Sequence, residues 1–325
     1  MTLVTGSTGF IGSHLVQRLQ REGADFRCLA RRGSHRHPAK DLPSIEADLD
    51  SGEGLDRALD GVTSVIHLAG VTKALRTADY YTGNGSATAI LAKAIRSKMD
   101  SGQSIRLVHV SSLAAAGPSL DGKPLTEDAV PAPVSHYGKS KLQAEKAVRA
   151  ALPDAVIVRP PVVYGPRDTD VFQMLKSVNR GMMLEIGGGE RFFSAIFASD
   201  LVEGLLVAAR HPAAAGRTYF LAHPDPVSWR ALGRAAARIL GRQARVVTIP
   251  LALARLAGLA GESVSWLTRK PVIISREKVA EAECRYWTCD PRRAADELGF
   301  VAFTSLDAGL GETLAWYKEA GWLKR

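Results

Sequence analysis

The 325-residue sequence has few cysteines, few aromatic residues and no long uninterrupted apolar run. Cys28, Cys284 and Cys289 are too few and too scattered for a disulfide framework, and no histidine cluster beside them predicts a zinc site. Met1–Gly6 run directly into a strand-like segment, so we expect no signal peptide. The most apolar later stretch, residues 249–267, is interrupted by charges and glycines and is too polar to span a bilayer. We therefore predict a cytoplasmic protein with no metal site and no membrane insertion.

The chain carries an excess of positive charge, with 42 Lys and Arg against 33 Asp and Glu and a formal net charge of +9. Such an excess can indicate an anionic partner such as nucleic acid. The basic residues are spread along the chain, however, aromatic residues make up only 6%, and no nucleic-acid-binding motif is present. The hydrophobic content of 46% is typical of a globular protein. We expect a small-molecule substrate and no nucleic-acid partner.

The first half of the chain alternates short β-branched segments with longer helical patterns, which predicts a parallel sheet covered by helices. Strands are expected at residues 2–5, 26–30, 44–47, 64–68, 105–111 and 155–159. Helices are expected at residues 11–22, 54–59, 87–98 and 136–150, and later at 229–240 and 251–267. Crossovers of this length are normally right-handed and give a doubly wound α/β sheet of the Rossmann type.

The pattern of predicted elements changes after Arg159, where prolines and glycines separate shorter helices and strands. We expect residues 1–165 to form the Rossmann domain, with residues 193–209 returning to it. Residues 166–325 are expected to form mainly a smaller, partly discontinuous substrate-binding domain. This second domain should close over the carboxyl edge of the sheet, where ligands bind in folds of this class.

A glycine-rich turn follows the first predicted strand. Gly6 permits a tight turn, Gly9 lets backbone amides approach a diphosphate, and Gly12 allows the next helix to pack closely on the strand. The helix N-terminus then presents free N–H groups and the positive end of its dipole to the phosphates. Because a strand precedes this turn and an amphipathic helix follows it, the pattern predicts a dinucleotide site and not merely a turn.

The residues after the second predicted strand indicate which dinucleotide binds. An acidic residue there would accept hydrogen bonds from the adenosine ribose and select NAD. This chain instead has Arg31 and Arg32. A guanidinium pairs well with a 2′-phosphate, so the sequence favours NADP over NAD. The alternative is that both arginines are solvated surface charges.

Tyr137 and Lys141 form the most informative pair in the sequence, because residues four apart lie on one face of a helix. The Lys141 ammonium can lower the pKa of the phenol and hold the nicotinamide ribose. A tyrosine tuned in this way can exchange the proton of an alcohol while hydride moves at the adjacent carbon. Upstream, the predicted fifth strand ends in Ser111 and Ser112, where a hydroxyl is well placed to bind a substrate carbonyl.

Together these motifs resemble the extended short-chain dehydrogenase/reductase family over nearly the whole chain. The resemblance implies a homodimer with Ser112, Tyr137 and Lys141 as catalytic residues. It places Asp48 near the adenine, although a helix N-cap is an alternative reading of that aspartate. The implied cofactor contacts are Gly6, Thr8, Gly9, Phe10, Ile11, Gly12, Arg31, Arg32, Asp48, Leu49, Leu68, Ala69, Gly70, Ser111, Tyr137, Lys141, Pro160 and Val163. The implied substrate contacts are Ser112, Tyr137 and Val162.

Family members include nucleotide-sugar epimerases and dehydratases as well as reductases of sterols and flavonoids. Here the inert Leu113 follows Ser112, where dehydratases have an acid, and Val162 stands where many nucleotide-sugar enzymes have asparagine. The sequence therefore resembles the dihydroflavonol reductase and 3β-hydroxysteroid dehydrogenase branch, which implies carbonyl–alcohol interconversion on a hydrophobic, non-nucleotide molecule. The alternatives are an epimerase or dehydratase with tightly bound NAD(P), and a non-catalytic NADP sensor or scaffold.

Overall fold

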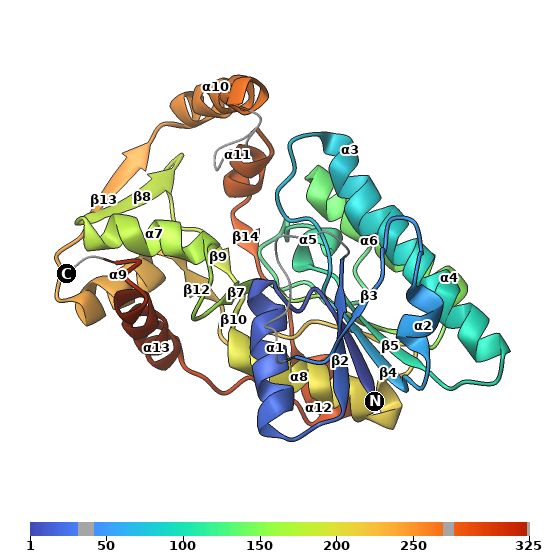
Figure 1. The fold of residues 1–325 in the computed structure, drawn as a ribbon. Coiled ribbons are helices and arrows are strands. Elements are labelled where there is room, and N and C mark those ends of the chain that lie inside the picture. The colour runs from blue at the N-terminus through green and yellow to red at the C-terminus, as the bar shows by residue number, and fades with distance from the viewer. Residues whose placement is uncertain (32–41, 269–275, 324–325) are drawn as a thin grey trace.

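A parallel sheet of seven strands forms the centre of the molecule (Figure 1). The computed structural model describes residues 1–31, 42–268 and 276–323. The strands lie in the order β11-β6-β5-β4-β1-β2-β3, and each neighbouring pair is parallel. Their bounds are β1 Thr2–Thr5, β2 Phe26–Ala30, β3 Ser44–Glu46, β4 Ser64–His67, β5 Arg106–Val110, β6 Val156–Val158 and β11 Thr218–Tyr219. The strand order reverses between β1 and β4, so the predicted doubly wound Rossmann sheet is confirmed.

The strands form where the sequence predicts them because most of them are short segments rich in apolar residues. In β6 all three residues are buried, as is typical of a parallel strand covered on both faces. Each predicted strand is present, with ends that differ by at most one residue. The seventh strand, β11, was not predicted because its two residues are too few to show a pattern.

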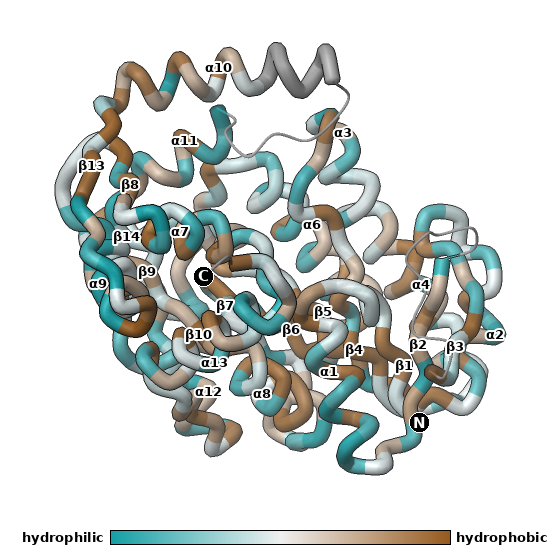
Figure 2. The backbone as a smooth tube through the Cα atoms, turned by 60° about the vertical axis from the view of Figure 1, so that its left-hand side comes forward, coloured by the Kyte–Doolittle hydropathy of each residue, from teal (hydrophilic) through white to brown (hydrophobic). Residues whose placement is uncertain are grey.

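Helices cover both faces of this sheet, and apolar residues are concentrated between the layers (Figures 1 and 2). On one face lie α1 Phe10–Arg21, α8 Ala198–Arg210 and α12 Arg292–Leu298, which contribute to one apolar cluster with the sheet. On the other face lie α2 Leu55–Leu59, α4 Ala87–Asp100 and α6 His136–Ala151, which contribute to a second cluster. The short elements between them are α3 Thr77–Tyr80, a π-helical turn at Tyr81–Ser86, α5 Leu113–Ala116 and a 3₁₀ turn at Pro212–Ala214.

A second group of elements surrounds an apolar cluster of its own. Its helices are α7 Asp170–Asn179, α9 Trp229–Leu240 and α13 Leu306–Glu319, and above them lie α10 Leu251–Thr268 and α11 Arg276–Glu283 (Figure 1). Three small sheets have the orders β10-β7, β12-β9-β14 and β13-β8. Their strands are β7 Val162–Tyr164, β8 Met182–Ile186, β9 Phe192–Phe193, β10 Ala195–Phe197, β12 Val227–Ser228, β13 Arg245–Ile249 and β14 Tyr286–Trp287.

The chain crosses between the two groups more than once. Helix α8, which begins in the predicted returning segment 193–209 and ends one residue beyond it, packs against α1 and the main sheet through Leu201, Val202 and Leu205. Helix α12 and the following Phe300 also contribute to that cluster, although they lie in the segment 166–325. These contacts support a discontinuous second domain, and the division itself stays a prediction. Among the described residues, no helix is long and apolar enough to cross a membrane.

Candidate active site

The glycine-rich turn connects β1 to α1 and has the shape that a dinucleotide site requires. Gly6 has a φ of +71°, and a Cβ there would lie 2.6 Å from the backbone nitrogen of Ala69. A Cβ on Gly12 would collide with the carbonyl oxygen of Gly6. The Gly9 N–H donates to that same oxygen at 3.0 Å, which closes the turn. No acidic residue lies in the first turn of α1, so the helix dipole at this end is available to an anion.

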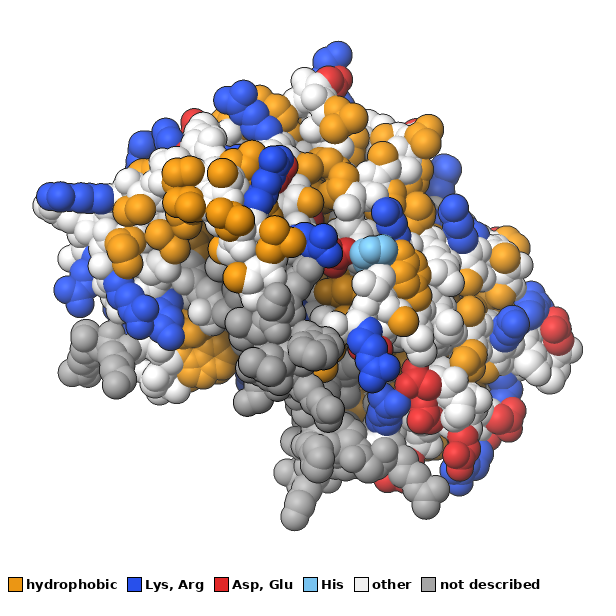
Figure 3. Space-filling view, turned by 90° about the horizontal axis from the view of Figure 1, so that it is seen from above, with side chains coloured by type: hydrophobic (Ala, Val, Ile, Leu, Met, Phe, Trp, Pro, Cys, Tyr) orange, Lys and Arg blue, Asp and Glu red, His pale blue; other side chains and the backbone are white. Residues whose placement is uncertain are grey.

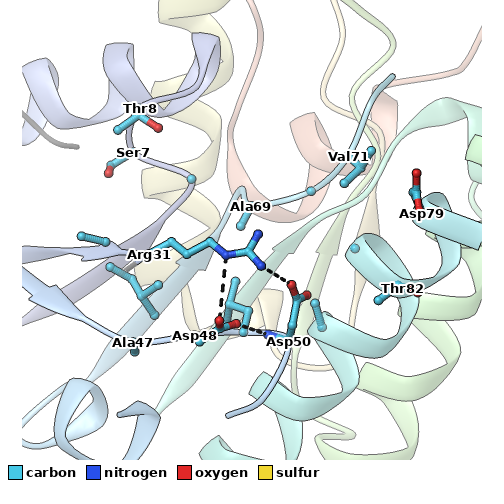
Figure 4. Close-up of a pocket in the computed structure, with 17 residues that line it drawn as sticks. Ser7, Thr8, Arg31, Ala47, Asp48, Asp50, Ala69, Val71, Asp79 and Thr82 are labelled. Carbon is cyan, nitrogen blue, oxygen red and sulfur yellow. Dashed lines mark hydrogen bonds and ion pairs between the residues drawn. The ribbon is translucent and has the colours of Figure 1, made fainter. Parts of the chain in front are cut away.

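A cleft of about 430 Å³ lies between this turn and the carboxyl ends of β2, β3 and β4 (Figure 4). Several predicted cofactor contacts line it, namely Gly6, Thr8, Arg31, Asp48, Leu49, Ala69 and Gly70. Sequence reasoning did not single out Ser7, Leu29, Ala30, Ala47, Asp50, Val71, Asp79, Thr82, Gly83 or Ala87, which also line it. Most of the missed residues are sequence neighbours of predicted contacts. Asp79, Thr82 and Gly83 come from α3 and the π-helical turn, where the sequence predicted no cofactor contact.

Other predicted cofactor contacts lie outside this cleft. Phe10, Ile11 and Gly12 form the first turn of α1, and Ile11 packs against the core cluster beneath it. Leu68 follows β4 and packs on the same cluster. The glycine turn therefore contributes backbone to the cleft, while the side chains that follow it anchor α1 to the sheet.

Arg31 follows β2 and extends across the cleft toward two aspartates (Figure 4). Its guanidinium Nη2 lies 2.6 Å from a carboxylate oxygen of Asp50, and its Nε lies 3.9 Å from Asp48. Asp48 accepts a hydrogen bond from the Asp50 N–H at 2.7 Å. The N-cap of α2 is Gly54, so the alternative reading of Asp48 as the cap of that helix is wrong. Arg32, the second predicted arginine, lies outside the described residues.

The two serines after β5 point in different directions. Ser112 has an extended backbone, and its Oγ accepts a hydrogen bond from the Ala114 N–H at 3.1 Å, which caps the short helix α5. Ser111 is buried and donates a hydrogen bond from its Oγ to Glu145 of α6 at 2.5 Å. Ser112 is therefore the serine whose hydroxyl can reach a substrate, while Ser111 is used inside the protein.

Tyr137 lies in the first turn of α6 and faces Ser112. Burial raises the pKa of the Tyr137 phenol, and a hydrogen bond with Ser112 lowers it by a smaller amount. The sequence predicts a pKa lowered by Lys141, and this expectation is wrong for the structure because burial has the larger effect. The phenol is thus neutral at physiological pH and able to donate its proton.

Lys141 lies one helical turn after Tyr137, and its side chain is 5% exposed. Its ammonium donates a hydrogen bond to the carbonyl oxygen of Val110, at the end of β5, over 2.7 Å. Burial lowers the pKa of Lys141 to about 8, although the carboxylate of Glu145 partly offsets this effect. The ammonium is therefore held at the carboxyl end of β5, two residues before Ser112.

A buried ion pair joins the three elements that hold these residues. The guanidinium of Arg159, after β6, binds both carboxylate oxygens of Glu145 at 2.9 Å and 2.6 Å. Glu145 lies on α6 and also accepts the hydrogen bond from Ser111 after β5. Both charged side chains are at most 7% exposed. A bidentate buried pair of this kind fixes the positions of β5, α6 and β6 relative to one another.

Asn84 joins the π-helical turn to the same site. Its side-chain oxygen accepts a hydrogen bond from the Val71 N–H at 2.7 Å, and its amide donates to the Ser140 Oγ at 2.9 Å. A Cβ on Gly70 would lie 2.7 Å from the Asn84 side-chain oxygen and 3.9 Å from the Lys141 ammonium. The loop after β4 is therefore tied closely to α6, next to Lys141.

The predicted contacts in the loop after β6 lie in packed surroundings. The Pro160 carbonyl oxygen accepts a hydrogen bond from the Leu113 N–H at 2.9 Å, which ties this loop to the residue after Ser112. Val163 packs against the core of the main sheet. Val162 packs against the cluster of the second group of elements and does not line the cleft. A substrate contact by Val162 stays a prediction.

Helix α11 approaches the start of α6 from the second group of elements. The carboxylate of Glu277 accepts a hydrogen bond from the His136 N–H at 2.5 Å, beside Tyr137. Lys278 and Glu281 lie close enough to affect the pKa of the Tyr137 phenol. Tyr80 of α3 contacts the Tyr137 ring edge to face, with the ring centroids 6.2 Å apart. Sequence reasoning missed these neighbours because about 140 residues separate α11 from α6 and no local pattern links them.

Comparison with known proteins places this site in a family. A model of the NAD dependent epimerase/dehydratase family matches residues 2–222. The chain belongs to this family. The resemblance to extended short-chain dehydrogenases/reductases is thereby confirmed, and the chain is an NAD(P)-dependent enzyme of the oxidoreductase and epimerase type.

Relatives within the epimerase/dehydratase family span both kinds of chemistry. The chain is 32% identical to a ceramide reductase of Caulobacter vibrioides over 324 residues, which cover 99% of this chain and 96% of the relative. It is 27% identical to the N-acetyl-α-D-glucosaminyl-diphospho-ditrans,octacis-undecaprenol 4-epimerase of Escherichia coli O157:H7, with 97% and 94% of the chains covered. Family membership therefore establishes the enzyme type but leaves the substrate class open.

Solved structures of the family share the whole fold. The crystal structure of gox2253 has a TM-score of 0.81 and 26% identity, and the match covers 100% of this chain and 99% of that one. MoeE5, solved in complex with UDP-glucuronic acid and NAD, has a TM-score of 0.76 and 26% identity, with 98% and 99% covered. A nicotinamide cofactor is thus common to the family, while the choice between NAD and NADP is a separate question for this chain.

Proposed function

We propose that this enzyme is an NADP-dependent oxidoreductase that interconverts a carbonyl and an alcohol on a hydrophobic, non-nucleotide molecule. The observation that carries the proposal is the gathering of three side chains at the carboxyl end of β5, where Ser112 lies close enough to affect the pKa of Tyr137 and the Lys141 ammonium is anchored on the Val110 carbonyl oxygen. This arrangement has a hydrogen-bond donor, a proton donor and a fixed positive charge within one small region.

Reduction of a carbonyl requires a hydride at carbon and a proton at oxygen. A dinucleotide held by the glycine turn and the adjoining cleft supplies or accepts the hydride. The Ser112 hydroxyl donates a hydrogen bond to the carbonyl oxygen, and Tyr137, which burial keeps neutral, donates the proton. In the reverse direction Tyr137 would first release its proton to solvent, and its phenolate oxygen would then receive the proton of the alcohol. Lys141 would hold the nicotinamide ribose and would stabilise negative charge on the phenol oxygen when the proton leaves.

Three variants separate these roles. Tyr137→Phe should reduce turnover about 10²–10⁴-fold, the usual effect of a positioned acid or base, with little change in NADP affinity. Ser112→Ala should lower turnover and leave cofactor binding intact, whereas Lys141→Met should impair both. Tyr80→Phe is the matched control because it keeps the ring packed on Tyr137 and removes only its own hydroxyl. Near-normal turnover by Tyr137→Phe would show that the assignment of the proton donor is wrong.

The preference for NADP is supported by Arg31, which lines the cleft and is 62% exposed. Strand β2 ends at Ala30, so no acid occupies the position that would favour the ribose of NAD. A 2′-phosphate would compete with Asp50 for the Arg31 guanidinium. We expect Arg31→Asp to weaken NADP binding about ten- to hundred-fold, while Arg21→Asp, an exposed change outside the cleft, has little effect. Equal or tighter binding of NAD by the unmodified enzyme would exclude the preference.

The proposed substrate class is supported by the full-length similarity to a ceramide reductase and by the residue after Ser112. Leu113 is 3% exposed and packs in an apolar cluster with Ala116 and Phe220, so it offers no second acid or base for the loss of water. The expected substrate is accordingly a carbonyl on a long-chain, lipid-like molecule. Consumption of NADPH with long-chain ketones of increasing chain length is the direct assay.

An epimerase acting on a nucleotide sugar is the second candidate, because a UDP-glucose 4-epimerase of Vibrio cholerae matches 80% of the chain and MoeE5, solved with UDP-glucuronic acid and NAD, matches 98% of it. Such an enzyme keeps its cofactor bound and consumes none of it. Calorimetric titration with UDP-sugars in the presence of NADP distinguishes the two. Micromolar binding, about −8 kcal/mol, together with cofactor that co-purifies would support the epimerase.

A further inference from the structure

In the part of α10 whose side chains the structure describes, residues 251–261, three leucines lie on the outside. Leu253, Leu256 and Leu259 are 56%, 60% and 48% exposed, whereas the buried positions of this part are occupied by Ala254 and Gly258. A helix that packed only on its own protein would have the opposite arrangement, with leucines inside. Because exposed leucines one turn apart form a continuous strip, this face has the character of a binding surface.

The adjoining two-stranded sheet continues this apolar character. Met182 and Leu184 of β8 are exposed, and Val247 of β13 is paired in register with Leu184. Paired residues project to the same side of a sheet, so these three side chains share the outward face. On the other face Met183 of β8 packs against α9, where a Cβ on Gly233 would lie 2.5 Å from its sulfur, while Val246 of β13, on that same face, is 38% exposed.

Positive charge borders the apolar residues. Arg245 is paired in register with Met182 and so lies on the outward face, and Arg242 is exposed in the turn before it. Neither has an acidic partner in the part of the chain that the structure describes. Among the described side chains of α10, the charged one is Arg255, which pairs with Glu283 of α11 at 2.8 Å. Figure 3 shows apolar side chains beside Lys and Arg, with few Asp or Glu, over β8, β13 and α10.

This surface is linked to the candidate active site through one helix, α11. Helix α10 packs on α11, and α11 contacts the start of α6 through the bond from the His136 N–H to Glu277, next to Tyr137. Helix α11 therefore connects the surface to the helix that carries Tyr137.

We propose that the face formed by Met182, Leu184, Val247, Leu253 and Leu256 docks the enzyme on the surface of an anionic lipid bilayer. The leucines enter the boundary between headgroups and acyl chains, and Arg242 and Arg245 contact the lipid phosphates. A second copy of the chain fits this face less well, because a twofold contact would bring unpaired arginines together. Docking in this manner does not require a spanning helix. The inference deepens the proposed function, since a lipid-like substrate would be taken from the same bilayer.

Vesicle co-sedimentation tests the proposal without any substrate. The unmodified enzyme should bind phosphatidylcholine vesicles that contain about 30% phosphatidylglycerol, and should bind more weakly at high salt. L253E/L256E should weaken this binding at least about tenfold. The matched control is V301E/F303E, which changes two exposed apolar residues after α12 and should leave vesicle binding unchanged. R242E/R245E should remove the preference for anionic over neutral vesicles.

Folding of the variants is verified by urea unfolding, and turnover of a short, water-soluble ketone should be unchanged in L253E/L256E. The proposal is overturned if the unmodified enzyme does not bind vesicles, or if L253E/L256E binds them equally well. It is also overturned if L253E/L256E only abolishes self-association in sedimentation velocity, which would identify a second copy as the occupant. Vesicle binding without reduction of any long-chain carbonyl would leave the docking face in place and refute the proposed function instead.

Discussion

Replacing Lys141 by methionine should make the folded chain more stable at neutral pH even as it removes activity. Burial lowers the pKa of Lys141 from 10.5 to about 8, so the folded state binds this proton more weakly than the unfolded state does. At pH 7 the charged ammonium therefore costs folding about 3 kcal/mol, since one pKa unit corresponds to about 1.4 kcal/mol. Methionine is similar in length and carries no charge. It leaves the Val110 carbonyl oxygen without its donor, which costs about 1 kcal/mol, so the expected net gain is about 2 kcal/mol.

The stability difference between the two proteins should also change with pH, in a direction that the lowered pKa of Lys141 fixes. A lowered lysine pKa means that the penalty is fully present below pH 8 and is relieved as the pH rises toward 10.5. At pH 9.5 roughly 1 kcal/mol of the penalty is left, so the stability of the unmodified chain should rise relative to Lys141→Met by about 2 kcal/mol between pH 7 and 9.5.

Equilibrium urea unfolding of both proteins, without added cofactor, at several pH values measures the difference directly. Lys139→Met is the matched control, because Lys139 lies on the same helix and is exposed. It should alter stability by less than about 0.5 kcal/mol at either pH. If Lys141→Met is less stable than the unmodified chain at pH 7, or if the difference does not change with pH, then burial of the Lys141 ammonium does not lower the free energy of unfolding.

Two further predictions concern the scaffold of the site. Gly12→Ala places a methyl group against the carbonyl oxygen of Gly6, so the turn must move and NADP affinity should fall at least about tenfold in a fluorescence titration. Gly311→Ala, in α13 with no atom within 4 Å of the added carbon, should leave that affinity unchanged. Glu145→Gln leaves the buried Arg159 without its charged partner and should cost about 3–5 kcal/mol in urea unfolding. A loss below 1 kcal/mol, roughly that of a surface pair, would show that this ion pair does not hold the three elements together.

The features that could be read from the sequence are those encoded within a short stretch of chain. The glycine turn depends on backbone conformations that glycine adopts most readily, and here Gly6 has the left-handed φ that such a turn requires. Tyr137 and Lys141 are four residues apart, and the geometry of one helix brings them to one face. Six strands of the main sheet were predictable for the same reason, since most of them are short apolar segments between helical patterns.

The tertiary structure decided what depends on residues far apart in the chain. It paired Arg31 with Asp50, gave Glu145 its partner Arg159, and placed α11 beside Tyr137. It also raised the pKa of Tyr137, against the expectation from Lys141 alone, because burial depends on every element that packs around the phenol.

Helix α10 also shows the difference between what is local in the sequence and what depends on the fold. The sequence by itself determined that residues 251–267 form an apolar helix, since the helical pattern is local. Which side of that helix faces solvent was decided by the packing of Ala254 and Gly258 toward the protein. Periodicity alone carries no information about where a neighbouring element will lie, and so the surface it leaves exposed could be found only in the folded chain.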